Sequence, residues 1–266
     1  MIANFHTHSS FCDGNNTPEE IINAAIEKGF SAIGFSGHGY TGFDLSYCMK
    51  NTDEYIKEIN ALKEKYKDDI QIYLGIEEDI FSLVDRNKFD YIIGSSHYFF
   101  KDNKYYPFDS DNDYFKKCLE LFNYDVLKLA ENYYILFCKY INSRKPDIIG
   151  HFDLITKFDE LGTSMFLQDN EYNKIAEKYV SEAAKIATLF EVNTGAIARN
   201  LRTTPYPANN LLYTLKKCNA KLIISSDSHD ISTLDFSFDE TKKYLREIGF
   251  RQLYTIYNNE FIKYDI

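Results

Sequence analysis

Histidines are the residues of this sequence whose type and spacing most directly indicate chemistry. His6 and His8 end the first apolar segment, and side chains two residues apart on a strand project from the same face. Two imidazoles on one face can chelate one metal ion. A lone His-x-His pair is weak evidence, because histidines near a turn are more often exposed or hydrogen-bonded than bound to metal.

The remaining four histidines strengthen the metal interpretation, because each follows a short apolar segment typical of a β-strand. They are His38, His97, His151 and His229. In a parallel barrel the carboxyl ends of the strands meet at one rim, where barrel enzymes place their active sites. Six unrelated structural histidines would have no reason to collect there. Together they predict a metal centre.

Two carboxylates occupy equivalent positions. Glu77 directly follows the apolar segment 72–76, and Asp227 follows the segment 220–226 shortly before His229. A carboxylate can bridge two metal ions, which an imidazole cannot. The alternatives are an acidic loop around Glu77 and a helix N-cap at Asp227. Their place at strand ends favours metal ligation for both.

A third carboxylate, Asp13, lies shortly after His8 in the segment Phe11-Cys12-Asp13-Gly14. It can return to the same rim, but an Asp-Gly pair is also typical of a turn, and both interpretations stay open. Cys12 is left out of the predicted site, because a thiolate would be unusual among imidazole and carboxylate ligands.

Ligation by nitrogen and oxygen suits Zn²⁺, Mn²⁺ or Fe²⁺, and the sequence does not select among them. The number of candidate ligands exceeds what one tetrahedral ion can use. We therefore expect two or three divalent metal ions, with a hydroxide held between neighbouring ions.

Two of the six arginines, Arg199 and Arg202, follow the apolar segment 188–193 and so lie beside the same predicted rim. The guanidinium group is well shaped to clamp a phosphate. On a chain with a net charge of −10 such a pair would form a local positive spot. The plain alternative is that both arginines face solvent on a loop.

Secondary-structure elements must hold these residues at the rim. The sequence predicts an alternation of strands and helices. The expected strands are 2–6, 31–35, 70–76, 89–95, 147–150, 188–193 and 220–226, with a weaker candidate at 252–256. Several are apolar throughout, as parallel strands buried on both faces are. The order favours a barrel or a doubly wound sheet.

Helix signals fall between these strands. Thr17, Pro18 and Glu20 offer an N-cap, a first-turn proline and a capping-box partner, and Gly29 closes that helix. Further helices are expected at 52–66, 170–187, 206–218 and 238–247, with a longer, mostly helical insertion around 110–144. No Gly- or Pro-rich linker divides the chain, so we expect one domain over residues 1–266.

Composition narrows the class of partner. The net charge of −10 argues against a nucleic-acid partner, and the 266 residues contain no apolar run long enough for a membrane helix. Five scattered cysteines and no signal peptide predict a cytoplasmic protein. No GxGxxG or Walker loop follows the first strand, which removes the usual nucleotide interpretations. A small anionic substrate remains, and the oligomeric state stays open.

Taken together, the motifs resemble the PHP (polymerase and histidinol phosphatase) superfamily. The resemblance spans residues 6 to 229 and rests on His6-Thr7-His8, Gly37-His38, Glu77, Ser96-His97, Gly150-His151, Glu191-Val192-Asn193-Thr194 and Asp227-Ser228-His229. The loop that contains Arg199, Arg202 and Pro205-Tyr206-Pro207 is similar to the histidinol-phosphate phosphatase branch of this superfamily.

The resemblance implies an α/β fold, a distorted (β/α)7 TIM-like barrel of the PHP type, with up to three metal ions. One ion would have the ligands His6, His8, Glu77 and Asp227, and a second would have Glu77, His97 and His151. A third would have His38 and His229, where many members add another histidine after the His-x-His pair. In this sequence Asp13 or no residue takes that histidine's place.

The implied activity is hydrolysis of L-histidinol phosphate to L-histidinol and phosphate in histidine biosynthesis, by in-line attack of a metal-bridging hydroxide. Catalytic roles would fall to Asp227, His229 and Glu77, with a metal-bound water as the alternative proton donor to His229. Substrate contacts would fall to Arg199, Arg202, Glu191 and Asn193, and the alternative for Glu191 is a buried strand carboxylate without such a contact. The alternatives are another small phosphomonoester, an amidohydrolase-like reaction, a PHP nuclease and a metal-binding module without turnover.

Overall fold

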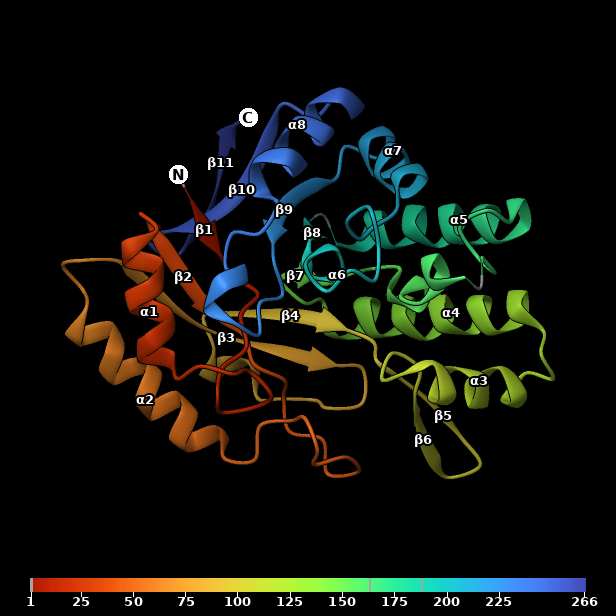
Figure 1. Ribbon diagram of the computed structural model, residues 1–266, viewed down its shortest axis with the longest axis horizontal. Helices are drawn as coiled ribbons and strands as arrows, with labels where there is room; N and C mark the ends of the chain where they lie inside the picture. Colours follow the sequence, from red (N-terminus) through yellow and green to blue (C-terminus); the bar gives the residue numbers. More distant parts are fainter. Residues whose placement is uncertain (1, 163, 188) are drawn as a thin grey trace.

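A parallel seven-stranded sheet forms the centre of the computed structural model, which describes residues 2–162, 164–187 and 189–266 (Figure 1). The strand order is β1-β2-β3-β4-β7-β8-β9, which is the order of the strands along the chain. The hairpin between β4 and β7 forms a separate two-stranded sheet. The bounds are β1 Ala3–Asn4, β2 Ala32–Phe35, β3 Gln71–Asp79, β4 Tyr91–Ser95, β7 Ile148–Ile149, β8 Leu189–Asn193 and β9 Lys221–Ser225.

The sheet closes on itself next to the predicted metal residues. Thr7 forms a parallel bridge with Ser228, and the His8 amide donates to the Ser228 carbonyl at 2.8 Å. The first strand segment therefore meets the last one, and the predicted (β/α)7 barrel is confirmed.

Seven predicted strands occur where the sequence places them, but their bounds differ, and β1 and β7 are each only two residues long. The predicted strand 188–193 begins at a residue outside the described ones. Strand β3 continues to Asp79, three residues beyond its predicted end, because Glu77, Glu78 and Asp79 pair with β4 in parallel register. Glu77 thus lies within a strand that is hydrogen-bonded to its neighbour, which fixes its side chain.

Helices cover the outside of the barrel (Figure 1). Their bounds are α1 Pro18–Glu27, α2 Thr52–Lys65, α3 Asn112–Leu121, α4 Val126–Arg144, α5 Asn170–Ile186, α6 Gly195–Ala198, α7 Asn209–Lys217 and α8 Phe238–Ile248. Thr17 and Glu20 form the predicted capping box of α1. Helix α7 begins three residues later than predicted, because Tyr206 is held in an antiparallel bridge to Asn193.

Two antiparallel hairpins lie outside the barrel sheet. The weak strand candidate near the C-terminus is β10, Gln252–Tyr257, and it pairs with β11, Glu260–Asp265. The second hairpin joins β5, Tyr98–Lys101, to β6, Lys104–Pro107, directly after His97. The sequence analysis did not find β5, β6 or β11. Among the described residues no helix is long and apolar enough to cross a membrane.

Tyr91 fills the barrel interior together with Phe5, Tyr73, Ile93 and Ile223. Its hydroxyl donates to the Phe5 carbonyl at 2.6 Å, which fixes the ring. Room for the ring comes from a glycine on the neighbouring strand, because a Cβ atom on Gly75 would lie 2.2 Å from the Tyr91 ring. This packed layer supports the rim directly above it.

We predict that Gly75→Ala destabilises the metal-free protein by about 3 kcal/mol, because the fixed Tyr91 ring cannot move away from the added methyl group. Urea unfolding of the variant measures this change. The matched control is Gly42→Ala on an exposed loop, where the nearest atom would lie 3.4 Å away and the expected change stays within about 0.5 kcal/mol. Equal unfolding midpoints for the two variants would contradict this account of the barrel interior.

Candidate metal centre

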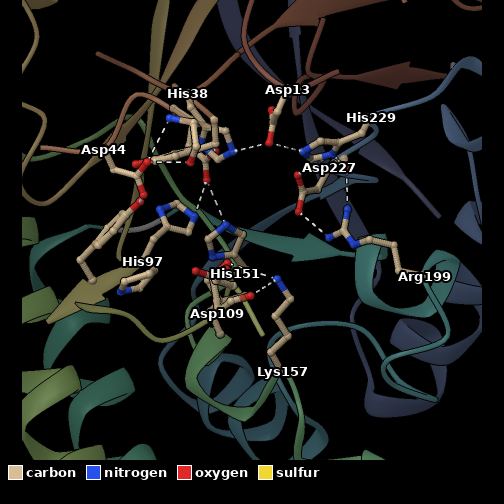
Figure 2. Close-up of a pocket in the computed structure, with 17 residues that line it drawn as sticks. Asp13, His38, Asp44, His97, Asp109, His151, Lys157, Arg199, Asp227 and His229 are labelled. Atoms are coloured by element: carbon tan, nitrogen blue, oxygen red, sulfur yellow. Dashed lines mark hydrogen bonds and ion pairs between the residues drawn. The ribbon is translucent and has the colours of Figure 1, made fainter. Parts of the chain in front are cut away.

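All six histidines and three carboxylates gather at the carboxyl-terminal rim of the barrel. Seven of these nine residues line one cavity (Figure 2), and the other two, His6 and His8, are buried. All nine divide into overlapping groups whose ligand atoms lie within 4.8 Å of one another. The nine residues are His6, His8, Asp13, His38, Glu77, His97, His151, Asp227 and His229. These are the nine residues that the sequence analysis named.

Glu77 is the centre of the larger part of this cluster, because five imidazoles surround its carboxylate. Oε1 lies 3.0 Å from His151 Nε2 and 3.4 Å from His97 Nε2. Oε2 lies 2.8 Å from His38 Nδ1, 3.4 Å from His6 Nε2 and 3.6 Å from His8 Nε2. A carboxylate with imidazoles on both oxygens has the arrangement of a bridging ligand.

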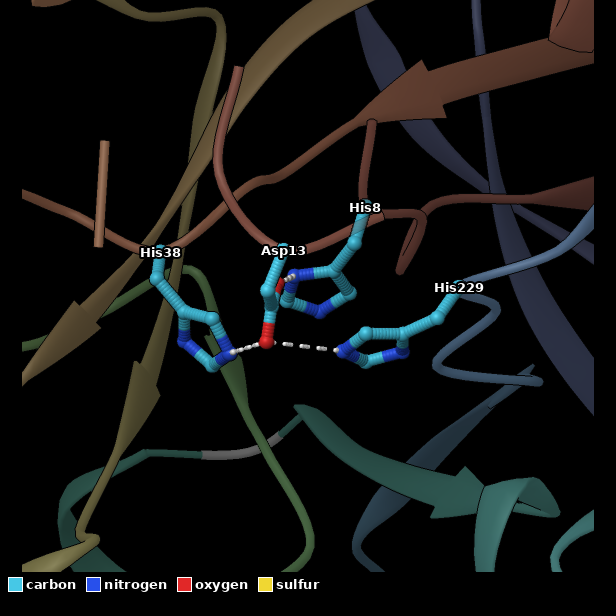
Figure 3. Close-up of side chains that lie close together, drawn as sticks. All are labelled: His8, Asp13, His38 and His229. Atoms are coloured by element: carbon cyan, nitrogen blue, oxygen red, sulfur yellow. Dashed lines mark ion pairs between the residues drawn. The ribbon is translucent and has the colours of Figure 1, made fainter. Parts of the chain in front are cut away.

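Asp13 does return to the rim (Figure 3). Its Oδ1 lies 3.5 Å from His8 Nδ1, and its Oδ2 lies 3.6 Å from His38 Nε2 and 3.4 Å from His229 Nε2. Asp13 lies in a turn, as an Asp-Gly pair predicts, and this turn also brings its carboxylate to the imidazoles at the rim. Three imidazoles around one carboxylate define a second, more exposed group.

Several buried polar atoms of the cluster have no hydrogen-bond partner among the described residues. They are His6 Nε2, His8 Nε2, Glu77 Oε2 and His151 Nδ1. Buried polar groups are nearly always paired. Here His6 Nε2 and His8 Nε2 lie 3.4 and 3.6 Å from Glu77 Oε2, and His8 Nε2 also lies 3.1 Å from Asp227 Oδ1. A divalent cation would pair with both nitrogens and with Glu77 Oε2, so the residues present fit a metal ion.

The electrostatics of the cluster favour positive charge. Burial alone would lower the pKa of His6, but the facing carboxylates, Glu191 first and then Glu77, raise it to about 10. Burial alone would raise the pKa of Glu77, but the surrounding imidazoles hold it well below its usual range. Positive charge in the cluster is therefore strongly stabilised, whether protons or a metal ion carry it.

Two further carboxylates lie next to the Nδ1 atoms of His97 and His6 and orient these rings. Asp79 accepts from the His97 amide at 2.8 Å and lies 3.2 Å from His97 Nδ1. Glu191 lies 2.6 Å from His6 Nδ1. Such contacts fix the ring direction and leave the other ring nitrogen facing the cluster.

The cavity in front of the cluster has a volume of about 380 Å³, large enough for a small molecule. Arg199 lines one wall, where its guanidinium lies 3.0 Å from Asp227 Oδ2. Lys157 also lines the cavity, and it donates to the Asp109 carbonyl at 2.6 Å (Figure 2). Positive side chains from two different loops therefore face the same space.

The structure brings only one of the predicted substrate residues to this cavity. Arg199 lines it, whereas the Arg202 side chain is fully buried, lies 3.5 Å from Asp153 and lines a separate surface cavity. Glu191 and Asn193 are also fully buried, behind the imidazoles. The reason is the strand pleat and the loop path, which turn these three side chains away from the open space.

The sequence analysis missed several residues that line the cavity. Lys157 and Asp109 come from loops with no strand-end motif, and Asp44, Tyr47 and Tyr98 come from the loop after β2 and from the hairpin. The only available signal was the run of aromatic residues directly after His97. That signal indicates packing as readily as a binding site.

Comparison with known proteins agrees with this geometry. A family model described as "PHP domain" matches residues 4–195. This chain therefore belongs to the PHP domain family, and the resemblance inferred from the motifs is confirmed.

Relatives of similar length match nearly the whole of this chain. A protein of Schizosaccharomyces pombe named "Probable histidinol-phosphatase" is 27% identical over 95% of this chain and 89% of its own length. A "Histidinol-phosphatase" of Lactococcus lactis is 26% identical over 94% of this chain and 93% of its own length. These similarities cover both the barrel and the rim loops.

A solved structure has the same fold. The crystal structure of histidinol phosphate phosphatase from Lactococcus lactis, in complex with zinc, L-histidinol and phosphate, matches with a TM-score of 0.73. The sequence identity is 21%, and the match covers 98% of each chain. The two chains therefore share the barrel from end to end.

The two arginines should behave differently when they are replaced. Arg202→Met should destabilise the protein by about 3–5 kcal/mol, because it leaves the Asp153 carboxylate buried without its partner. Arg199→Met should change stability by no more than about 1 kcal/mol, since its side chain is 38% exposed. Thermal and urea unfolding check both values, and a larger loss for Arg199→Met would contradict these placements.

Proposed function

We propose that this chain is a metal-dependent phosphomonoesterase that hydrolyses L-histidinol phosphate to L-histidinol and phosphate, a reaction of histidine biosynthesis. The observation that carries the proposal is the placement of one guanidinium, Arg199, in a cavity that is also lined by seven of the nine candidate ligands. The names of the full-length relatives support the same substrate. Residues 1–266 would act as one domain.

The proposed ligands divide among three positions. One set is His6, His8, Glu77 and Asp227, a second is Glu77, His97 and His151, and a third is Asp13, His38 and His229. Zinc, manganese or iron suits this mixture of nitrogen and oxygen atoms. Divalent ions held there would supply Lewis-acid charge that neutralises a phosphoryl group and makes water a better nucleophile.

The side chains around Asp227 position the reacting groups. Its Oδ1 lies 3.1 Å from His8 Nε2 and its Oδ2 lies 3.0 Å from the Arg199 guanidinium. Arg199 would bind phosphoryl oxygens at this point. Asp227 would orient the attacking water and accept its proton while the alcohol leaves on the opposite side of phosphorus.

The leaving alcohol oxygen needs a proton, and His229 is the proposed donor while no ion occupies the third position. Once Nε2 binds an ion it has no proton to give, and a water molecule held by the ions would donate in its place. The His229 side chain is 29% exposed at the edge of the cavity, and its Nδ1 lies 3.0 Å from the Asp227 carbonyl. This contact points Nε2 toward Asp13 and the open space. Glu77 would act by helping to hold the ions.

A phosphate-release screen tests the proposed function. After loading with zinc, manganese or iron, the protein should hydrolyse L-histidinol phosphate with a higher kcat/KM than sugar phosphates, phosphotyrosine or dinucleotides. Removal of metal with a chelator should abolish release, and adding metal back should restore it. Preference for another phosphomonoester would replace the proposed substrate, and activity that survives chelation would overturn the metal-dependent mechanism.

Asp227→Asn should remove turnover, because an amide does not accept the proton of the attacking water. We expect kcat to fall by about 10²–10⁴-fold, the usual contribution of a general base. Inorganic phosphate should still bind, which calorimetry measures. Full activity in this variant would exclude Asp227 from the reaction.

Asp13→Asn should lower the zinc content by one ion per chain, because an amide is a much weaker ligand than a carboxylate. Elemental analysis of dialysed protein gives the number. Asp44→Asn is the matched control, since Asp44 also lines the cavity and lies outside the ligand groups. An unchanged zinc content in Asp13→Asn would show that Asp13 does not hold metal.

A further inference from the structure

Glu191 is a fully buried carboxylate that the proposed mechanism does not use. It lies on β8, and both its side chain and that of His6 are fully buried. Its side chain crosses the barrel interior to β1, past the intervening strand β9. A charge in such a place must be matched by specific partners.

Every polar contact of Glu191 is with a hydrogen-bond donor. Oε1 lies 2.6 Å from His6 Nδ1. Oε2 accepts from the His151 amide at 2.8 Å and from Asn193 Nδ2 at 3.0 Å. Asn193 is itself fixed, because its Oδ1 accepts from the Gly195 amide at 2.9 Å. The position therefore requires a group that only accepts, on both of its oxygens.

These contacts decide which nitrogen of His6 keeps its proton when a cation binds. A carboxylate opposite Nδ1 makes Nδ1 the donor, so a cation would displace the proton on Nε2, whose lone pair would then face the cluster. Among the residues that the structure describes, Nε2 has no hydrogen-bond partner, and it lies 3.4 Å from Glu77 Oε2. One carboxylate also holds the His151 main chain, so two candidate ligands from different strands share the same support.

We infer that Glu191 is a positioning residue for the metal centre, which fixes the Nδ1–H form of His6 and the strand end at His151, and is not a contact of the substrate. This inference rests on the proposed metal-dependent function. It assigns a role different from the substrate contact that the sequence indicated, because the carboxylate lies behind the imidazoles and not in the cavity.

Replacement by an amide disturbs this arrangement in either orientation. In Glu191→Gln an amide nitrogen facing His6 would favour the tautomer with a proton on Nε2, the nitrogen that would bind metal. The opposite orientation would set the amide nitrogen against two donors. Loss of such a support typically lowers metal affinity by about 10–100-fold.

The test measures zinc affinity of the wild-type protein and of Glu191→Gln by competition with a chelator. We expect a loss of about 10–100-fold in the variant. The matched control is Glu78→Gln, a buried carboxylate on β3 whose partners are Arg144 and Tyr140. Its zinc affinity should stay within about threefold of wild type, even if its stability falls with the loss of the ion pair.

Kinetics at saturating zinc separate a positioning role from a substrate contact. With L-histidinol phosphate, the KM of Glu191→Gln should stay within about threefold of wild type once the metal sites are filled, because the cost falls on metal affinity. An unchanged zinc affinity combined with a strongly raised KM would overturn the inference. Failure of the wild-type protein to bind zinc would overturn the proposed function first.

A measurement on the wild-type protein tests the inference without relying on a variant that must fold. Long-range proton–nitrogen NMR correlations of the zinc-loaded protein report which ring nitrogen of His6 carries hydrogen. Nδ1–H is the expected result. A proton on Nε2 would overturn the inference even if no variant could be purified.

Discussion

The structure depends on one arrangement, a buried carboxylate, Glu77, with five imidazoles within 3.6 Å of its two oxygens. So many ionisable groups in a buried site are strongly unfavourable unless charge is balanced at short range. The carboxylates of the cluster already draw protons onto its imidazoles, and a divalent ion satisfies the same demand with better geometry. The rim is therefore organised for cations before any substrate is considered.

The barrel supplies what this arrangement requires. Strand β3 holds Glu77 within its parallel ladder to β4, and the bridge from Thr7 to Ser228 brings the first and last strands together. Below the rim, the fixed Tyr91 ring fills the interior, so the imidazoles rest on a packed layer. Carboxylates behind His6 and His97 then set the directions of individual rings.

Sequence periodicity predicted the barrel strands and nearly all helices, because buried parallel strands are apolar runs and the helix signals fall between them. The nine candidate ligands followed, since a residue type such as histidine at a strand end carries its own chemical meaning. Arg202 and Glu191 could not be placed, because the direction of a loop or interior side chain depends on contacts across the barrel. The hairpin after His97 was missed because its aromatic residues show no clean alternation.

Anomalous diffraction from crystals grown with zinc tests the central claim most directly, because it locates metal without reference to activity. The account predicts at least two zinc peaks inside the cluster, one on each side of the Glu77 carboxylate, with the imidazoles of His6, His8, His97 and His151 as ligands. Zinc found only outside the cluster, or a Glu77 carboxylate with no metal on either oxygen, would contradict it.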